Sequence, residues 1–445
     1  MDSGSTAWVL AAAALVLFMT PGLAFFYGGF VRNKNVLGTI MQSFIAVGVV
    51  GVLWVVIGYS LAFGPSVGDA GIIGNLDHFG LKGVGAAPDG QVAGIPHEAF
   101  MIFQAMFAII TPALITGAFA ERAKFGPFLV FLAAWSLLVY APVAHWVFDS
   151  EGWIFADLKG LDFAGGTAIH VNAGAAALAA AFVFGRRKGY GEEPMEPHDV
   201  TMIVLGTAIL WFGWFGFNAG SAGAANAQAA NAFVVTNTAA ATAALTWCLM
   251  SWWRGGKPSV VGTAAGAVAG LVAITPASGY VQPMEALGIG AVAGIICYFA
   301  VQLRTASSID DSLDVVAVHG VGGLWGALAT GIFATAAFGG VDGLANGGGF
   351  DQLWRQAVGI AAVAPYSFVV TFVILKALDI VVGIRVNEED EISGLDVSQH
   401  GERAYIFGGA GPVLGIPEAI PVDTPAGARM VAEPVLQTDT GSGAH

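Results

Sequence analysis

Two histidines, His170 and His319, lie several residues inside long apolar runs. An ionisable side chain at such a depth is costly and marks a functional site by default. Because burial disfavours the charged form of imidazole, each ring is expected to be neutral, with one N–H donor and one acceptor nitrogen. The pair could therefore hydrogen-bond a neutral polar solute or relay a proton. Two structural histidines that bond helix carbonyls are the alternative.

Metal or enzymatic chemistry has less support. No Cys, Asp or Glu lies one helical turn from either histidine, and neither H-x-x-x-H nor H-E-x-x-H occurs. Cys248 and Cys297 lie in separate apolar runs, which argues against a disulfide framework or a zinc site. No nucleophile and base stand at a catalytic spacing. We predict no metal, no cofactor and no enzymatic activity.

The composition shows that the histidines must be held by membrane-spanning helices. The 445 residues are 56% hydrophobic and 11% charged, with a mean hydropathy of +0.73. A soluble domain carries about 25% charged residues. Most acids behind the net charge of −14 fall in loops and after Asp379, so nucleic-acid binding is not expected. We predict an all-α membrane protein whose eleven transmembrane helices lie near 6–29, 36–63, 99–120, 127–148, 164–184, 200–219, 232–253, 260–277, 285–303, 314–335 and 356–383.

The basic residues predict the orientation of these helices. Alternate breaks carry most of them, and the basic side is cytoplasmic. The N-terminus is then on the outer side of the membrane and the C-terminus in the cytoplasm. The membrane is predicted to be the cytoplasmic (inner) membrane of the cell. The basic breaks carry Arg32, Lys34, Arg122, Lys124, Arg186, Arg187, Lys188, Arg254, Lys257 and Arg304, and the others carry Lys82, Lys159 and Arg355.

An internal repeat relates the two histidines. Asp162 precedes His170, and Asp314 precedes His319, each pair followed by a glycine-rich stretch. Five predicted spans separate the copies, so they have opposite orientations. Such an inverted five-helix repeat places a solute site near the midplane in many transporters. Both aspartates are expected to cap the starts of their helices rather than to bind a ligand.

Aromatic residues gather at the predicted outer end of the third span. Phe100, Phe103 and Phe107 share one helix face at spacings of three and four. Aromatic faces attract cations without adding a charge. Enrichment of aromatics at membrane interfaces is the simpler explanation.

These residues resemble the ammonium transporter (Amt/Mep/Rh) family, in its bacterial and archaeal Amt branch. The resemblance covers nearly the whole chain to about residue 405. Its most specific part is the sequence DFAGGTAIHVNAG at 162–174, followed by GRR at 185–187. Supporting motifs are GLAFFYGG at 22–29, FQAMFA at 103–108, GAFAER at 117–122, WFGFNAGSAG at 214–223 and DVVAVHGV at 314–321.

The resemblance implies a transporter of ammonium or ammonia, with methylammonium as an analogue. It implies a homotrimer in the lipid bilayer, each subunit having its own pore, and a PII-type regulatory protein at the cytoplasmic face. It further implies a gate of Phe107 and Phe217, a pore lined by His170 and His319, and support of the site by Asp162. The vestibule would comprise Phe103, Phe107, Phe148, Ser221 and Trp214.

One departure from the family concerns this vestibule. Bacterial members usually have Trp where this chain has Phe148, and a glycine-rich run where it has Asp149 to Glu151. Phenylalanine is a weaker cation–π partner than tryptophan. The two acids could offset the loss by raising the local cation concentration. Alternatives to transport are an ammonium sensor with little flux and a membrane metalloenzyme.

The chain is predicted to have three parts. Residues 1–383 form the transmembrane domain, with repeats at about 6–184 and 200–335 and a final helix at 356–383. Residues 384–407, of mixed charge, form a cytoplasmic C-terminal regulatory segment. Residues 408–445, rich in Gly, Pro, Thr and Ala without periodicity, are predicted to be a disordered tail.

Overall fold

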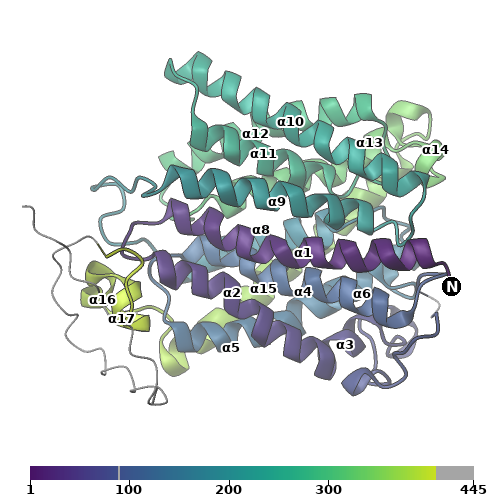
Figure 1. The fold of residues 1–445 in the computed structure, drawn as a ribbon, viewed down its shortest axis with the longest axis horizontal. Helices are drawn as coiled ribbons and strands as arrows, with labels where there is room; N and C mark the ends of the chain where they lie inside the picture. Colours follow the sequence, from purple (N-terminus) through teal and green to yellow (C-terminus); the bar gives the residue numbers. More distant parts are fainter. Residues whose placement is uncertain (89–90, 407–445) are drawn as a thin grey trace, which may run out of the picture. The chain divides into compact units, whose positions relative to one another are not determined.

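Helices dominate the computed structural model, which describes residues 1–88 and 91–406 (Figure 1). The described residues contain no β-strand, and extended pairing there is confined to two isolated bridges. Ten of the described helices are long and apolar enough to cross a membrane. The prediction of an all-helical multi-pass membrane protein is confirmed.

The helices of the first half lead from the N-terminus to His170. Two apolar stretches are interrupted by π-helical turns, and a third begins with one, η5, which carries this histidine. The elements are α1 (Ser3–Phe30), α2 (Val36–Leu53), η1 (Trp54–Gly58), α3 (Tyr59–Phe63), η2 (Gly68–Ala70), η3 (Phe79–Leu81), α4 (His97–Phe119), α5 (Phe125–Trp135), η4 (Ser136–Tyr140), α6 (Ala141–Phe148), α7 (Trp153–Ala156), η5 (Gly166–Val171) and α8 (Asn172–Phe184).

The second half leads to His319, which also lies in a π-helical turn, η6. The elements after it include the last long helix, α15, and the described part of the chain ends with two short helices, α16 and α17. The elements are α9 (Val200–Gly220), α10 (Ala227–Gly255), α11 (Val260–Ile274), α12 (Pro283–Ala306), η6 (Val316–Val321), α13 (Gly322–Phe333), α14 (Ala336–Gly339), η7 (Leu344–Asn346), α15 (Asp351–Val382), α16 (Glu388–Ser393) and α17 (Leu395–His400).

The predicted eighth span, 260–277, is shorter than expected. It corresponds to α11, which has 15 residues and ends at Ile274. At 1.5 Å per residue this helix is about 22 Å long, which is less than the roughly 30 Å of a bilayer core. The chain continues from it in turns through Tyr280. Ten helices, rather than the predicted eleven, therefore have the length of a span in the described part of the chain.

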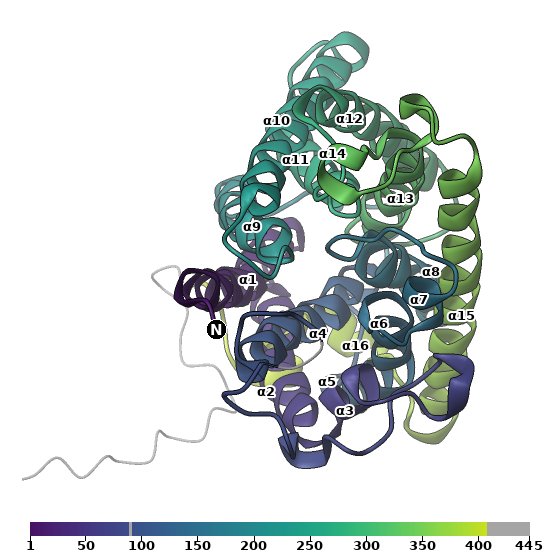
Figure 2. The same ribbon diagram turned by 90° about the vertical axis from the view of Figure 1, so that its right-hand side faces the viewer.

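The helices of the two halves interlock around the histidines. Seen nearly end-on in Figure 2, α1 lies beside α9, and α15 runs along α8 and α13. The two π-helical turns that carry the histidines each contact the other half: η5 contacts α13, and η6 contacts α8. The two turns also contact each other. The histidines are thereby brought to the contact between the halves.

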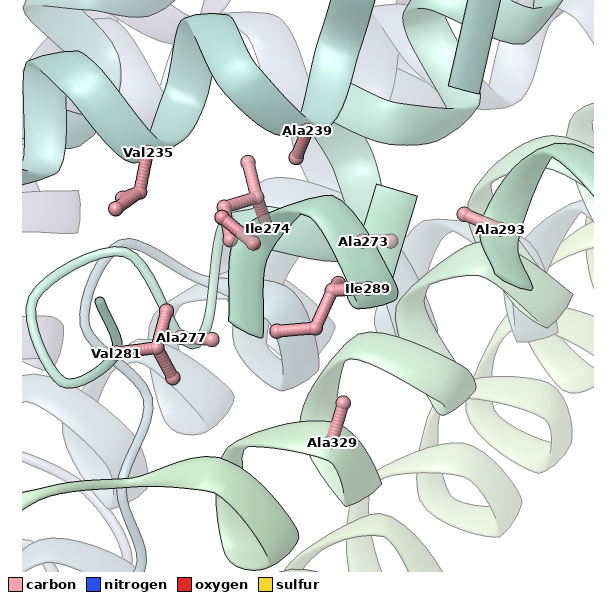
Figure 3. Packing of buried hydrophobic residues seen from close by; sticks show 10 residues of the cluster. Val235, Ala239, Ala273, Ile274, Ala277, Val281, Ile289, Ala293 and Ala329 are labelled. Atoms are coloured by element: carbon pink, nitrogen blue, oxygen red, sulfur yellow. The ribbon is translucent and has the colours of Figure 1, made fainter. Parts of the chain in front are cut away.

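Small apolar side chains fill the second half (Figure 3). Ala239 on α10, Ala273 on α11, Ala293 on α12 and Ala329 on α13 are fully buried. In a lipid environment, helix association depends on close van der Waals packing, which small residues permit. This explains how an alanine-rich segment holds four helices in place.

Residues 384–404 pack onto helix ends of the same unit, which comprises residues 1–404. The Asp396 carboxylate accepts a hydrogen bond from the Gly38 amide at 2.9 Å, at the start of α2. The Leu395 amide donates to the Asn35 side chain at 2.8 Å. Residues 405–445 form a separate unit, and the predicted tail at 408–445 lies outside the described residues.

Candidate functional site

A hollow of about 660 Å³ contains four of the five predicted vestibule residues. Its lining includes Phe103 and Phe107 from α4, Phe148 from the end of α6, and Ser221 after α9. The Ser221 hydroxyl donates to the carbonyl of Phe217 at 2.8 Å, and both of its lone pairs can still accept. Three of the predicted vestibule rings and one hydroxyl thus line this hollow, together with charged side chains that include Lys159, Asp351 and Arg355. We call it the outer hollow, because it lies at the end that the basic residues predict to face outward.

Asp162 also lines the outer hollow and caps η5. One carboxylate oxygen accepts from the amides of Gly165 and Gly166 at 3.0 and 2.6 Å. The other accepts from Thr167 and Ala168 at 2.8 and 3.0 Å. Four charge-assisted bonds fix the start of the turn that carries His170. They leave the carboxylate little capacity to bind a ligand as well.

Two phenylalanine rings lie at the bottom of the outer hollow. The centroids of Phe107 and Phe217 are 4.5 Å apart, and the rings are only 2% and 1% exposed. Phe103 packs edge-on against Phe107 at 4.8 Å. Phe217 in turn lies over the imidazole of His170, at 6.0 Å between centroids. A continuous stack of rings therefore connects the hollow to the histidines.

His170 and His319 bind each other in the buried centre. Their Nδ1 atoms are 3.2 Å apart and the rings are nearly parallel, at an interplanar angle of 24°. In a hydrogen bond between these atoms, one Nδ1 carries a proton and the other accepts it, so the two neutral rings are opposite tautomers. Nε2 of His170 is buried and has no partner among the described residues. It is a free polar atom in an apolar space.

The space beside the histidines is narrow. It measures about 10 Å³ and is lined by Met19, Leu23, Ile110, Leu114 and Val268, together with the rings around them. A cavity needs roughly 10–15 Å³ to hold one water molecule. The space therefore suits a single molecule of that size and offers it hydrogen bonds only from imidazole.

Trp214 lies in this narrow space and not in the outer hollow, where the sequence placed it. Its ring stacks on His170 at 5.4 Å, and its Nε1 donates to Thr275 Oγ1 at 2.9 Å. One helical turn separates it from Phe217 on α9, so the same face of α9 carries both rings that stack on His170. We therefore reassign Trp214 to the wall beside His170.

Two glycines allow the histidines to approach. Gly174 lies four residues after His170, and a Cβ there would come within 2.3 Å of the Cα of Gly320. Gly323 lies four residues after His319, and a Cβ there would meet Val171 N at 3.0 Å. Each glycine thus packs on the π-helical turn of the other half. Close backbone approach at small residues is typical of membrane helix crossings.

A second hollow, of about 350 Å³, lies on the other side of the histidines. His319 and Phe26 line both this inner cavity and the narrow space. Asp314, Trp247 and Tyr298 are among its other lining residues. In space, the outer hollow is therefore followed by the two phenylalanines, then by the histidines, and then by the inner cavity.

The two acids after Phe148 have different surroundings. Asp149 is 1% exposed and accepts from Gln91 Nε2 at 2.6 Å and from the Glu151 amide at 2.8 Å. Glu151 is exposed and accepts from the Ser66 amide at 2.7 Å. Neither acid lines the outer hollow, although Phe148 and Ser150 do. Asp149 therefore stabilises the loop after α6 through its hydrogen bonds with Gln91 and the Glu151 amide.

The cap of the second π-helical turn is Asp311, which the sequence analysis missed in favour of Asp314. Oδ2 of Asp311 accepts from the Val316 amide at 2.7 Å. Asp314 instead pairs with Arg304 at 2.7 Å. The signal that could have found Asp311 is spacing, since it lies eight residues before His319, as Asp162 does before His170.

Comparison with known proteins adds an independent result. The profile of the Ammonium Transporter Family matches residues 7–405. The Ammonium transporter of Bacillus subtilis is 48% identical over 408 residues, covering 91% of this chain and 99% of that protein. Ammonium transporter Amt1 of Archaeoglobus fulgidus is 47% identical over 405 residues, covering 91% and 100%.

Solved structures resemble the fold at the same level. Candida albicans Mep2 has a TM-score of 0.81 at 43% identity and covers 88% of each chain. A protein described as Sensor Amt Protein has a TM-score of 0.81 at 31% identity, covering 89% of this chain and 98% of that one.

Proposed function

We propose a mechanism of ammonium transport for this chain, on the premise that it belongs to the ammonium transporter family and carries ammonium across a membrane. Ammonium is recruited as a cation in the outer hollow and, near Phe107 and Phe217, gives a proton to Nε2 of His170. Ammonia then passes the histidine pair and reaches the inner cavity. The observation that carries this proposal is the spatial order of outer hollow, phenylalanine pair, narrow space and inner cavity around His170 and His319.

Recruitment depends on the aromatic rings of the outer hollow. Phe103, Phe107 and Phe148 line it, and ring faces attract a cation by about 0.5–1 kcal/mol at an exposed site. The Ser221 hydroxyl can accept one N–H of the ion. Asp162 supports the hollow by holding η5 in place. The rings and the hydroxyl carry no charge, so their contacts are weak enough for the ion to leave again.

Loss of the proton follows from the apolar lining beyond the gate. Transfer of an ion into such a space is very costly, and an ionisable group neutralises instead. Ammonium can do this because it has a proton to release. Potassium has none and is excluded, although it also binds aromatic faces.

The histidine pair receives neutral ammonia and relays the proton. Opposite tautomers of His170 and His319 leave one Nδ1 proton shared across 3.2 Å. Nε2 of His170 can bond the passing molecule. A proton that enters at one ring and leaves at the other reverses both tautomers. This relay makes transport electrogenic.

The topology and assembly of the family extend to this chain in the same proposal. The two π-helical turns that carry the histidines are each capped by an aspartate eight residues before the histidine, which supports an inverted repeat. We count α11, the eighth predicted span, as a membrane helix in addition to the ten longer ones. Basic breaks support an outside N-terminus in the cytoplasmic membrane. We infer a homotrimer, with residues 1–383 as the transport domain. Residues 384–407 would act as the regulatory segment, open to a PII-type protein.

Growth on low ammonium tests the function directly. A strain that lacks its own ammonium transporters should grow when it produces this chain, and methylammonium should compete. His319→Ala should not restore growth at the same membrane abundance. A wild-type chain that reaches the membrane and fails to support growth would contradict the proposal.

A sensor with little flux is the second candidate, since a similar structure is described as Sensor Amt Protein. Uptake of labelled methylammonium into proteoliposomes separates the two. Uptake by the purified chain well above protein-free liposomes supports transport. Binding without uptake would support the sensor.

A further inference from the structure

The segment between α12 and η6 contains three aspartates, of which Asp310 pairs with Arg187 and Asp314 lines the inner cavity. Asp311 is fully buried, and its Oδ2 caps η6 through the Val316 amide. Its other oxygen, Oδ1, is buried without a hydrogen-bond partner among the described residues. A buried, unpaired carboxylate oxygen is costly unless it carries or exchanges a proton.

The corresponding aspartate of the first half has no such free oxygen. Asp162 also lies eight residues before its histidine, and its two oxygens accept from four amides. Asp311 has the same place in the repeat but an incomplete set of donors. Helix capping alone would not need this difference. The four amides around the outer aspartate favour its charged form, whereas the inner one has an oxygen that can hold a proton.

Asp314 lies three residues after Asp311, between it and His319 in the chain. It lines the inner cavity together with His319, five residues further along the chain. Its Oδ1 pairs with Arg304 at 2.7 Å, and its side chain remains 22% exposed. Its backbone has a φ of 59°, which is unusual for a residue with a side chain. The local fold thus holds this carboxyl group at the cavity wall.

The charges around the pair keep a proton within reach at neutral pH. Burial, and next the charge of Asp314, raise the pKa of Asp311 to about 7, although the Val316 amide and Arg304 act against this. Burial likewise raises the pKa of Asp314 against the charge of Arg304. Further charged or titratable groups that act on the two carboxyls are Arg187, Asp310 and Tyr27.

We propose that Asp311 and Asp314 form the inner proton-exchange site, where the relayed proton rejoins ammonia. This rests on the proposed function. The proton from His319 binds the carboxylate pair, which becomes a carboxylic acid. Ammonia in the inner cavity takes this proton through its lone pair, which leaves ammonium and regenerates the carboxylate. The net result is one ammonium ion released from the inner cavity, with no other reactant.

Currents in proteoliposomes test this site. The full-length chain is reconstituted, ammonium is added outside, and the charge current is recorded at lumenal pH values from about 6 to about 8. The wild-type current should fall as lumenal pH drops through about 7, because the pair is then already protonated from the inside. Asp311→Asn should lower the current at least about tenfold and flatten this pH profile. Asp314→Asn should act in the same direction.

Controls separate proton exchange from misfolding. Asparagine can still accept from the Val316 amide, so Asp311→Asn should keep the thermal midpoint of the wild type. Asp379→Asn, at the inner end of α15 and 39% exposed, should leave the current unchanged. An infrared difference spectrum between about pH 6 and about pH 8 should show a protonated carboxyl band that Asp311→Asn removes.

The outcomes also separate this inference from the proposed function. A wild-type chain that takes up ammonium without current would overturn the proton relay itself. A normal wild-type current, with unaltered current and pH profile in both asparagine variants, would overturn the role of the aspartate pair alone. Absence of the infrared band from the wild type would do the same.

Discussion

The imidazoles of His170 and His319 share a single hydrogen-bond proton between Nδ1 atoms 3.2 Å apart, in a space of about 10 Å³. Neither ring can change tautomer without the other. Replacement of one ring therefore interrupts the relay while the second remains in place. His170→Ala and His319→Ala should each lower the ammonium-evoked current at least about tenfold. Currents in proteoliposomes measure this, and an undiminished current in either variant would contradict the relay.

The phenylalanine gate should exclude ions by keeping the pore dry. Phe217→Ala removes one ring of the pair, admits water beside His170 and lowers the cost of a charge there. We expect potassium currents that the wild type lacks. Phe212→Ala is the matched control, since Phe212 lies on the same helix and is 56% exposed. Potassium exclusion equal to that of the wild type would show that Phe217 is not the barrier.

The glycine at the crossing of the two halves should be intolerant of a side chain. In Gly174→Ala, the new methyl group would collide with the Gly320 backbone. We expect destabilisation of about 1–3 kcal/mol, which is typical of overpacking, and reduced uptake. Gly288→Ala in α12 is the control, because its added Cβ would meet no atom within 4 Å. Equal thermal midpoints of the two variants in detergent would refute this reading of the crossing.

Glu121 should make the inner side of the protein sensitive to acid. It pairs with Arg187 at 2.8 Å and with Arg32 at 3.1 Å. Burial acts to raise the pKa of Glu121, but the two arginines prevail and lower it to about 2. Because the folded pKa is depressed, the stabilisation is complete above about pH 4.3 and disappears as pH falls towards 2.

Substitution at this ion pair tests the acid sensitivity. Glu121→Gln should cost about 1.5–3 kcal/mol at neutral pH, because Arg187 loses one charged partner while its pair with Asp310 remains. It should also flatten the stability profile between about pH 5 and about pH 2. Asp351→Asn removes an exposed pair with Arg355 and should change stability by about 0–1 kcal/mol. Thermal midpoints against pH measure both, and identical acid profiles for Glu121→Gln and wild type would rule the role out.

The outer hollow should bind cations more tightly with a larger ring. Phe148→Trp restores the residue usual in bacterial relatives and strengthens the cation–π contact by about 0.5–1 kcal/mol. The half-saturation concentration for methylammonium uptake should fall about two- to fivefold. Phe79→Trp, in an outer loop and 52% exposed, should leave it unchanged. A higher half-saturation concentration would mean that Phe148 is adapted to its loop rather than to the ion.

The sequence was sufficient to predict ten of the eleven membrane helices and the burial of the two histidines. Apolar length and an ionisable residue inside an apolar run are local signals. Details that depend on three-dimensional register were not accessible to it. Trp214 shares a motif with Phe217, yet lies one turn before it in α9, where its ring stacks on His170. Asp314 is nearer to His319 in sequence, but the positive φ at this residue turns its side chain to Arg304 and leaves the cap to Asp311.

The loop after α6 shows the same limit. Two acids in an outer loop suggested a field that attracts cations, but the contacts of Asp149 with Gln91 and the Glu151 amide direct it into the protein. The π-helical turns were not predicted either. Two of them, η5 and η6, lie where the halves contact each other, and no local sequence pattern encodes that contact. Tertiary contacts decide both features.

The approach of Gly174 to Gly320 also bears on how the protein can move. Many transporters with inverted repeats work by rocking one half against the other. Here the backbones of the halves touch beside the histidines, so sliding or tilting would drive one main chain into the other. The cycle must then run on small events, such as ring rotation at the gate and proton jumps between imidazoles. Such side-chain events take picoseconds to microseconds rather than the microseconds to milliseconds of domain motion, so we expect this protein to conduct like a channel with a rigid frame.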